Sequence, residues 1–145
     1  MSSIKAIAIK NRPRVAMQVI DSAQITVANG ILGDFRGSQS GRQITILSES
    51  DWHKACAEVE TDLPWTVRRA NLLVDDVEFD ESFVGKTVRI GEVELRVIEE
   101  TDPCSRMDAQ HQGLTAALTP DWRGGICCDV VKPGSIKIGD RIEFA

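Results

Sequence analysis

The residues best suited to chemistry in this chain stand together in the segment Glu99–Arg106, which reads Glu-Glu-Thr-Asp-Pro-Cys-Ser-Arg. The alternating apolar and polar run Val93–Ile98 leads into this segment and predicts a β-strand. Because proline cannot continue a strand ladder, we expect the strand to end near Pro103 and to leave Cys104 at the mouth of a sheet. A thiol in that position, with an arginine two residues further on, is suited to metal ligation or sulfur chemistry; the alternative is a half-buried loop cysteine without a function.

Two charged neighbours compete over the state of the Cys104 thiol. Asp102 disfavours the thiolate and Arg106 favours it, and each is two residues away. A bound metal cation would decide the competition, because it deprotonates a coordinating thiol. We therefore expect a thiolate at Cys104 when a metal is bound.

The other cysteines and the two histidines do not form a recognisable zinc motif. No C-x-x-C pair is present, and His53 and His111 are far from each other in sequence. Cys56 has helical spacing with Trp52, Ala55 and Val59, which predicts a core position. Cys127 and Cys128 are adjacent in an apolar run that predicts a strand, so we expect their side chains on opposite faces as small hydrophobic residues.

Three further segments carry candidate binding residues at turns or strand ends: Gly30–Asp34, Gly41–Thr45 and Arg68–Val74. Glycines allow positive φ and close approach of another group, although a simple hairpin explains them equally well. An arginine beside such a turn can fork onto an anion or remain a solvated surface residue. If Thr66–Val74 is a strand, two of its polar residues share one face and could bind a phosphate or a polar ring edge. The candidates are Gly33, Asp34, Arg42, Arg69 and Asn71.

The elements that must position these residues are short strands separated by turn signals. The glycine-rich run Gly30–Gly41 predicts turns, and Ser48 with Asp51 predicts a helix start. A second short helix is predicted over Gln112–Leu118. Many short strands with few helices indicate a mainly β barrel or sandwich. The predicted strands are Ile4–Ile9, Ala16–Ile20, Gln24–Ala28, Arg42–Leu47, Thr66–Val74, Thr87–Ile90, Val93–Ile98, Gly124–Val131 and Ile136–Phe144.

Length and charge limit the class of protein. The 145 residues suit one domain, 1–145, with a single good core. A net charge of −5 argues against a nucleic-acid partner, which would require a basic face. No run of about 20 apolar residues is present to span a membrane, and the N-terminus has no signal-peptide pattern. We therefore expect a cytoplasmic protein with reduced cysteines.

Taken in order, these segments resemble the MOSC family, the domain at the C-terminus of molybdenum-cofactor sulfurases. The resemblance runs from Ile4 to Phe144. Gly30–Asp34 is similar to the family's G-[IL]-x-G-D turn, Arg42–Thr45 to its R-Q-[VI]-T strand, and Arg69–Leu72 to its R-x-N-[LIV] segment. Pro103-Cys104 matches the position of the functional cysteine, and Gly134–Asp140 matches the closing G-x-[IV]-x-x-G-D hairpin.

The resemblance implies a MOSC-type β-barrel with one or two short helices. It implies that Cys104 is a sulfur carrier or a ligand to molybdenum in a pterin-dithiolene cofactor, and that Arg69 and Asn71 hold the pterin and phosphate. The partners implied are the molybdenum cofactor or a persulfide donor, with a separate electron-donor or cysteine desulfurase protein.

Three functions remain open from the sequence. The first is a cofactor-binding or sulfur-carrier domain acting through Cys104. The second is a small molybdenum-dependent reductase of N-hydroxylated compounds, and the third is a cofactor-free interaction domain. The H-G-G segment of bacterial reductase relatives is replaced here by Gly37–Gly41 without a histidine. The chain has no pyridoxal-phosphate-dependent desulfurase domain, so it would not generate persulfide by itself.

Overall fold

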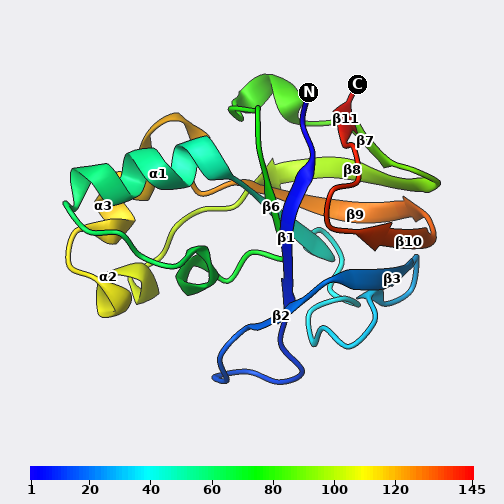
Figure 1. The fold of residues 1–145 in the computed structure, drawn as a ribbon, viewed down its shortest axis with the longest axis horizontal. Coiled ribbons are helices and arrows are strands. Elements are labelled where there is room, and N and C mark those ends of the chain that lie inside the picture. Colours follow the sequence, from blue (N-terminus) through cyan, green and yellow to red (C-terminus); the bar gives the residue numbers. More distant parts are fainter.

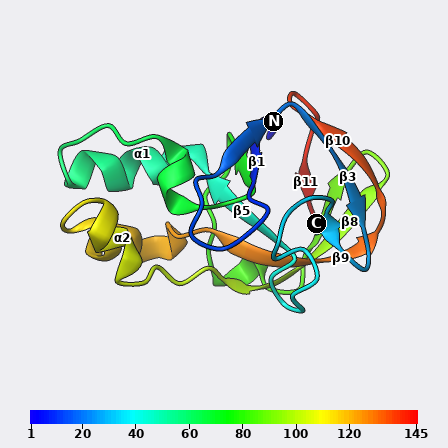
Figure 2. The ribbon, with the colours of Figure 1, turned by 90° about the horizontal axis from the view of Figure 1, so that it is seen from below.

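Two sheets form the framework of the fold, and together they curl into a half-barrel (Figures 1 and 2). The computed structural model describes residues 1–145. The larger sheet has eight strands in the order β11-β7-β8-β9-β5-β6-β1-β2, and the smaller has the order β10-β3-β4. All neighbouring strands are antiparallel except the parallel pair β5 and β6. The strands are β1 Ile4–Ile9, β2 Gln18–Ile20, β3 Ser22–Thr26, β4 Gly30–Ile31, β5 Ile44–Ser48, β6 Leu72–Val74, β7 Thr87–Ile90, β8 Val93–Glu100, β9 Ile126–Lys132, β10 Gly134–Lys137 and β11 Glu143–Phe144.

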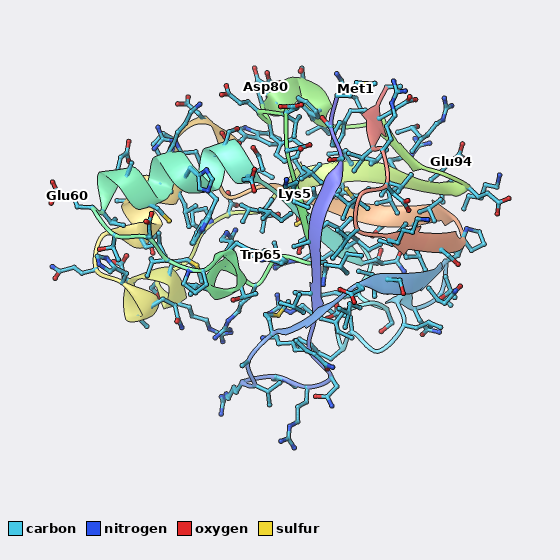
Figure 3. The ribbon with its side chains drawn as sticks, in the orientation of Figure 1. Met1, Lys5, Glu60, Trp65, Asp80 and Glu94 are labelled. Carbon is cyan, nitrogen blue, oxygen red and sulfur yellow. The ribbon has the colours of Figure 1, made fainter.

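The helices gather at one side of the strands (Figure 1). The α-helices there are α1 Glu49–Glu58, α2 Arg106–Gln110 and α3 Leu114–Leu118. The chain also forms the 3₁₀ turns η1 Trp65–Arg68, η2 Glu81–Phe83 and η3 Pro120–Trp122. None of the helices is long and apolar enough to cross a membrane. Figure 3 places Trp65, the first residue of η1, between the helices and the strands, while Glu60 and Glu94 lie at opposite ends of the molecule.

Strand β5 separates two hydrophobic cores. Its residues alternate: Ile44 and Ile46 belong to the core of 19 buried residues inside the half-barrel, and Leu47 belongs to a second core of 10 buried residues beneath the helices. All five residues of β5 are buried, as expected for a strand covered on both faces. Thr45 shares the face of β5 with Leu47, so its side chain lies on the face of the strand that is covered by the helices.

The mainly β prediction is confirmed, and so is the predicted start of the first helix. Ser48 caps α1 by accepting a hydrogen bond from the Asp51 backbone N–H at 3.3 Å.

The predicted strand Thr66–Val74 is wrong over its first half. Residues Trp65–Arg68 form η1 instead, and Arg69 adopts a left-handed conformation with φ of 66°, so only Leu72–Val74 are extended. Arg69 and Asn71 consequently do not share a strand face. The helix predicted over Gln112–Leu118 begins later, at Leu114, and α2 was not predicted.

Asp51, in the first turn of α1, has a protonation state that depends on folding. Its side chain is buried, and its Oδ2 has no hydrogen-bond partner. Burial raises the pKa of Asp51 to about 6, against the opposing effects of a hydrogen bond from the Phe79 backbone and of Lys54. The unfolded chain therefore loses this proton near pH 4, whereas the folded protein keeps it until about pH 6.

We expect Asp51 to lower the free energy of unfolding as the pH rises from 4 to 7, by roughly 2 kcal/mol. Asp51→Asn should remove this part of the pH dependence, because the amide does not ionise. Urea unfolding at pH 4.5 and pH 7.5 measures it, with the exposed Asp62→Asn as the matched control. Equal pH dependence in the native protein and Asp51→Asn would contradict the expectation.

Candidate functional site

A cavity of about 210 Å³ brings together five arginines and one cysteine. It opens on the helical face of β5, beside Thr45. Asp102 is the only carboxylate in its wall, although the whole chain carries a net charge of −5. Such a local excess of guanidinium groups favours an anionic ligand. The lining residues are Arg36, Arg42, Thr45, Arg68, Arg69, Ala70, Thr101, Asp102, Cys104, Arg106, Met107 and Gly124.

Segments far apart in sequence supply the five arginines. Arg36 lies in the turns that follow β4, and Arg42 lies two residues before the start of β5. Arg68 ends η1, and Arg69 follows it in a left-handed conformation that turns the chain toward β6. Arg106 is the first residue of α2, six residues after β8 ends at Glu100. The positive charge of the cavity therefore arises only when the chain folds, because no short sequence motif contains all five arginines.

Arg68 is the most deeply buried of the five, with 8% of its surface exposed. Its Nη2 donates to the backbone carbonyls of Thr101 and Gly124, both at 3.0 Å. Burial lowers the pKa of Arg68 to about 10, and the thiols of Cys104 and Cys127 oppose this shift, so the group stays charged at neutral pH.

Two arginine nitrogens in the cavity wall are left without a partner. The Nε atoms of Arg42 and Arg68 are buried and make no hydrogen bond within the protein. Buried donors are nearly always paired in folded proteins. Inside an arginine-lined cavity, the oxygens of an anion are the natural acceptors for them.

Cys104 lies at the rim of this cavity and is the only exposed cysteine, which confirms the position predicted from Pro103. Its backbone is held by α2 and α3, because its carbonyl accepts hydrogen bonds from the Met107 N–H at 2.9 Å and the Thr115 hydroxyl at 2.7 Å. The other three cysteines are buried, as predicted. Burial raises the pKa of both Cys127 and Cys128.

Among the sequence-predicted site residues, Arg42, Arg69 and Cys104 line the cavity together. Asn71 lies behind them and is buried. Its Oδ1 accepts from the Thr45 backbone N–H at 3.0 Å, and its Nδ2 donates to the Ala8 carbonyl at 3.2 Å. These bonds tie β1 to β5, so Asn71 holds the framework beneath the arginines.

Asp34 and Gly33 shape the turn that carries Arg36. The Asp34 carboxylate accepts from the Lys10 backbone N–H at 3.1 Å, and burial raises the pKa of Asp34. Gly33 has φ of 93°, and an added Cβ would lie 3.2 Å from the Ile9 side chain. Asp34 lines a small recess beside the main cavity, whereas Gly33 lines neither.

Sequence reasoning missed Arg36, Arg68 and Gly124 as site residues. Arg36 lies inside the glycine-rich turn, and Arg68, as the neighbour of Arg69, would point to the opposite face of the predicted strand Thr66–Val74, which does not form over these residues. Gly124 forms part of the wall because a Cβ there would lie 2.3 Å from the Thr101 carbonyl oxygen and 3.1 Å from Arg68 Nη2. The pair Gly124-Gly125 before an apolar strand was the available signal for this close approach.

A second cavity of about 310 Å³ adjoins the first and shares Arg69 with it. Its wall joins the loop before β2 to η1 and the end of α2, through Arg14, Met17, Thr66, Val67 and Gln110. The site can therefore accept a ligand longer than the first cavity alone.

Comparisons with known proteins agree with this fold. The family model described as MOSC domain matches residues 32–143. The YuaD protein from Bacillus subtilis has a similar structure, with a TM-score of 0.81 and 18% identity over 98% of this chain and 94% of that one. YiiM from Geobacillus stearothermophilus has a TM-score of 0.81 and 13% identity, over 100% of this chain and 75% of that one. YiiM from Escherichia coli has a TM-score of 0.75 and 15% identity, over 99% of this chain and 69% of that one. No curated protein matches the sequence. With 112 consecutive residues matched by the family model, the chain belongs to the MOSC domain family.

Proposed function

We propose that the cavity binds a molybdenum-pterin cofactor and that Cys104 is the protein ligand to its metal. The MOSC domain family is commonly associated with the molybdenum cofactor. The observation that carries the proposal is the meeting of five arginines with one exposed thiol around a single cavity. Arginines suit the phosphate of such a cofactor, and a thiolate suits a metal already bound to sulfur.

The residues present fit this group in charge and in size. The buried, unpartnered Nε atoms of Arg42 and Arg68 provide donors for anionic oxygens. The main cavity of about 210 Å³ and the adjoining one of about 310 Å³ together fall within the range of roughly 300–1,000 Å³ typical of ligand sites. Gly124 keeps the wall beside Arg68 free of a side chain.

The metal would depend on the cofactor for most of its ligands. No group of three or more His, Cys, Asp or Glu side chains in the protein could hold a metal ion by itself. Cys104 would therefore add one sulfur to a metal that the pterin already holds, and the bound group would supply two-electron redox chemistry. The chain's own contribution is to bind the anionic part through the arginines and to present the thiol at the rim.

A sulfur-carrier role uses the same geometry, and the exposure of Cys104 favours it as the second candidate. A thiol at an open rim is within reach of a donor protein such as a cysteine desulfurase that carries a persulfide. The Cys104 sulfur would attack the outer sulfur of that persulfide, so that a new S–S bond forms on Cys104, the S–S bond of the donor breaks, and the donor thiolate leaves without a net change of oxidation state. Reduction of an N-hydroxylated base by the loaded protein with an artificial electron donor distinguishes a reductase from a carrier, because a carrier would turn over none.

Arg69→Ala tests the proposal because Arg69 lines both adjoining cavities. We expect molybdenum and pterin content per chain to fall by roughly tenfold or more after purification from a cofactor-competent host, since a lost charge-assisted hydrogen bond costs about 1.5–3 kcal/mol. Metal analysis and pterin fluorescence measure the two contents. The exposed Arg12→Ala, outside both cavities, is the matched control, and full retention by Arg69→Ala would overturn the proposal.

A further inference from the structure

Cys104 is the one thiol in the wall of the arginine cavity, and it is exposed there. Its backbone carbonyl accepts hydrogen bonds from Met107 and Thr115, so the segment that carries it is held by α2 and α3. Arg106, two residues further along the chain, is also exposed and lines the same cavity. An anion held by the arginines would therefore lie beside a free thiol.

The charge and size of the cavity suit a small dianion. Five arginines face one carboxylate, that of Asp102, so two negative charges on a ligand are readily balanced. Arg68 is 8% exposed, and its Nε, like that of Arg42, is buried without a hydrogen-bond partner. The cavity of about 210 Å³ has room for a tetrahedral oxyanion and some water, since one water molecule takes up about 30 Å³ in the liquid.

Only some anions of this size have an atom that a thiol attacks readily. Phosphate and sulfate have none, whereas thiosulfate has a sulfonate end that suits arginine and an outer sulfur held by an S–S bond, which thiolates cleave. A thiolate and a dianion repel each other in water, and the arginines would offset that repulsion. They would also stabilise the charge that develops on the departing sulfite. The cavity therefore favours the meeting of these two anions.

We propose that the cofactor-free protein accepts sulfur from thiosulfate onto Cys104 and passes it on. This inference rests on the sulfur-carrier role proposed for the same cavity, and it names the donor. The Cys104 thiol gives its proton to water, and its sulfur attacks the outer sulfur of thiosulfate. A new S–S bond forms on Cys104, the S–S bond of thiosulfate breaks, and sulfite leaves with the electron pair. The Cys104 sulfur is oxidised by as much as the sulfonate sulfur is reduced, so no other oxidant is required.

A small thiolate or cyanide then takes the sulfur away. The acceptor attacks the outer sulfur of the Cys104 persulfide, a bond between the acceptor and that sulfur forms, and the persulfide S–S bond breaks. Cys104 leaves as the thiolate and regains a proton from water, which completes the cycle. Cys104 could thus be loaded by a small molecule as well as by a protein donor. A bound cofactor would occupy the cavity, so the reaction belongs to the empty form.

The first measurement treats purified, cofactor-free protein with thiosulfate and follows its mass. We expect the intact protein to gain one sulfur atom, and peptide mapping to place that atom on Cys104. The buried Cys56, Cys127 and Cys128 are internal controls and should gain none. With cyanide added as the acceptor, thiocyanate should accumulate over many turnovers, and Cys104→Ser should form it only at the rate found without protein.

A substitution that removes one charge shows whether the arginines hold the donor. Arg106→Gln takes away an exposed guanidinium of the cavity wall. Arg96→Gln is the matched control, because Arg96 is exposed on β8 and lines neither cavity. We expect sulfur transfer from thiosulfate to slow by about tenfold or more in Arg106→Gln, which is the scale of one lost hydrogen bond to a charged group. The rate should be unchanged in Arg96→Gln.

An uncharged dialkyl trisulfide separates binding by the arginines from reactivity of the thiol. Both variants should take sulfur from this donor at the native rate. Equal thiosulfate rates in Arg106→Gln and Arg96→Gln would overturn the inference, and so would an equal loss of rate with thiosulfate and trisulfide in Arg106→Gln. A protein that gains sulfur from a persulfide-carrying cysteine desulfurase but not from thiosulfate would refute this inference alone. Failure with the desulfurase and with thiosulfate would refute the sulfur-carrier role as well.

Discussion

Replacing Cys104 by serine is expected to remove molybdenum from the purified protein while leaving the fold intact. The side chain is exposed at the cavity rim, and its sulfur takes no part in the core. A serine hydroxyl is a harder ligand that seldom deprotonates, so it binds poorly to a metal already held by sulfur. We expect molybdenum per chain to fall by at least about tenfold, the scale on which even outer-shell changes weaken metal sites.

Metal analysis of the two proteins from one cofactor-competent host measures this effect, and thermal unfolding without cofactor checks the fold. Ser105→Ala is the matched control, because Ser105 is exposed next to Cys104 and its side chain caps no helix. A variant that loses sulfur transfer but keeps molybdenum would favour the carrier role. If Cys104→Ser retained both, Cys104 would be a bystander.

The position of Cys104 could be predicted because it depends on local rules. An alternating strand that runs into a proline must end, and the structure ends β8 at Glu100, so the following thiol falls at the edge of the sheet. The cap of α1 by Ser48 and the turns after β4 follow in the same way from residues next to one another in sequence.

The arginine cavity could not be predicted as a whole, because its members meet only through tertiary packing. The run Thr66–Val74 alternates well enough to suggest a strand, yet Trp65 packs against the core beneath the helices and the chain winds into η1. That single difference places Arg68 in the cavity wall beside Arg69, where its Nη2 donates to two backbone carbonyls. Sequence spacing does not encode such a contact between residues 33 and 56 positions apart.

Gly125→Ala is expected to destabilise the protein strongly, through both sterics and backbone strain. Gly125 is buried with φ of 96°, and an added Cβ would lie 2.2 Å from the Ile46 carbonyl oxygen in β5. No flexible side chain can yield there, because the obstacle is the backbone of a strand covered on both faces. The Gly125 carbonyl also accepts the Thr101 N–H at 2.9 Å, so a shift would disturb the cavity wall.

We expect the free energy of unfolding to fall by roughly 2–4 kcal/mol in Gly125→Ala. Gly139→Ala separates the two causes, because Gly139 has a similar φ of 91° but open space around its Cβ position. The free energy of unfolding of Gly139→Ala should fall by only about 1 kcal/mol, which is the cost of a left-handed conformation for an L-residue. Urea unfolding of both variants gives the difference, which is the steric cost of approaching β5. Equal losses in the two variants would mean that β5 moves aside, and that Gly125 is required for its backbone conformation alone.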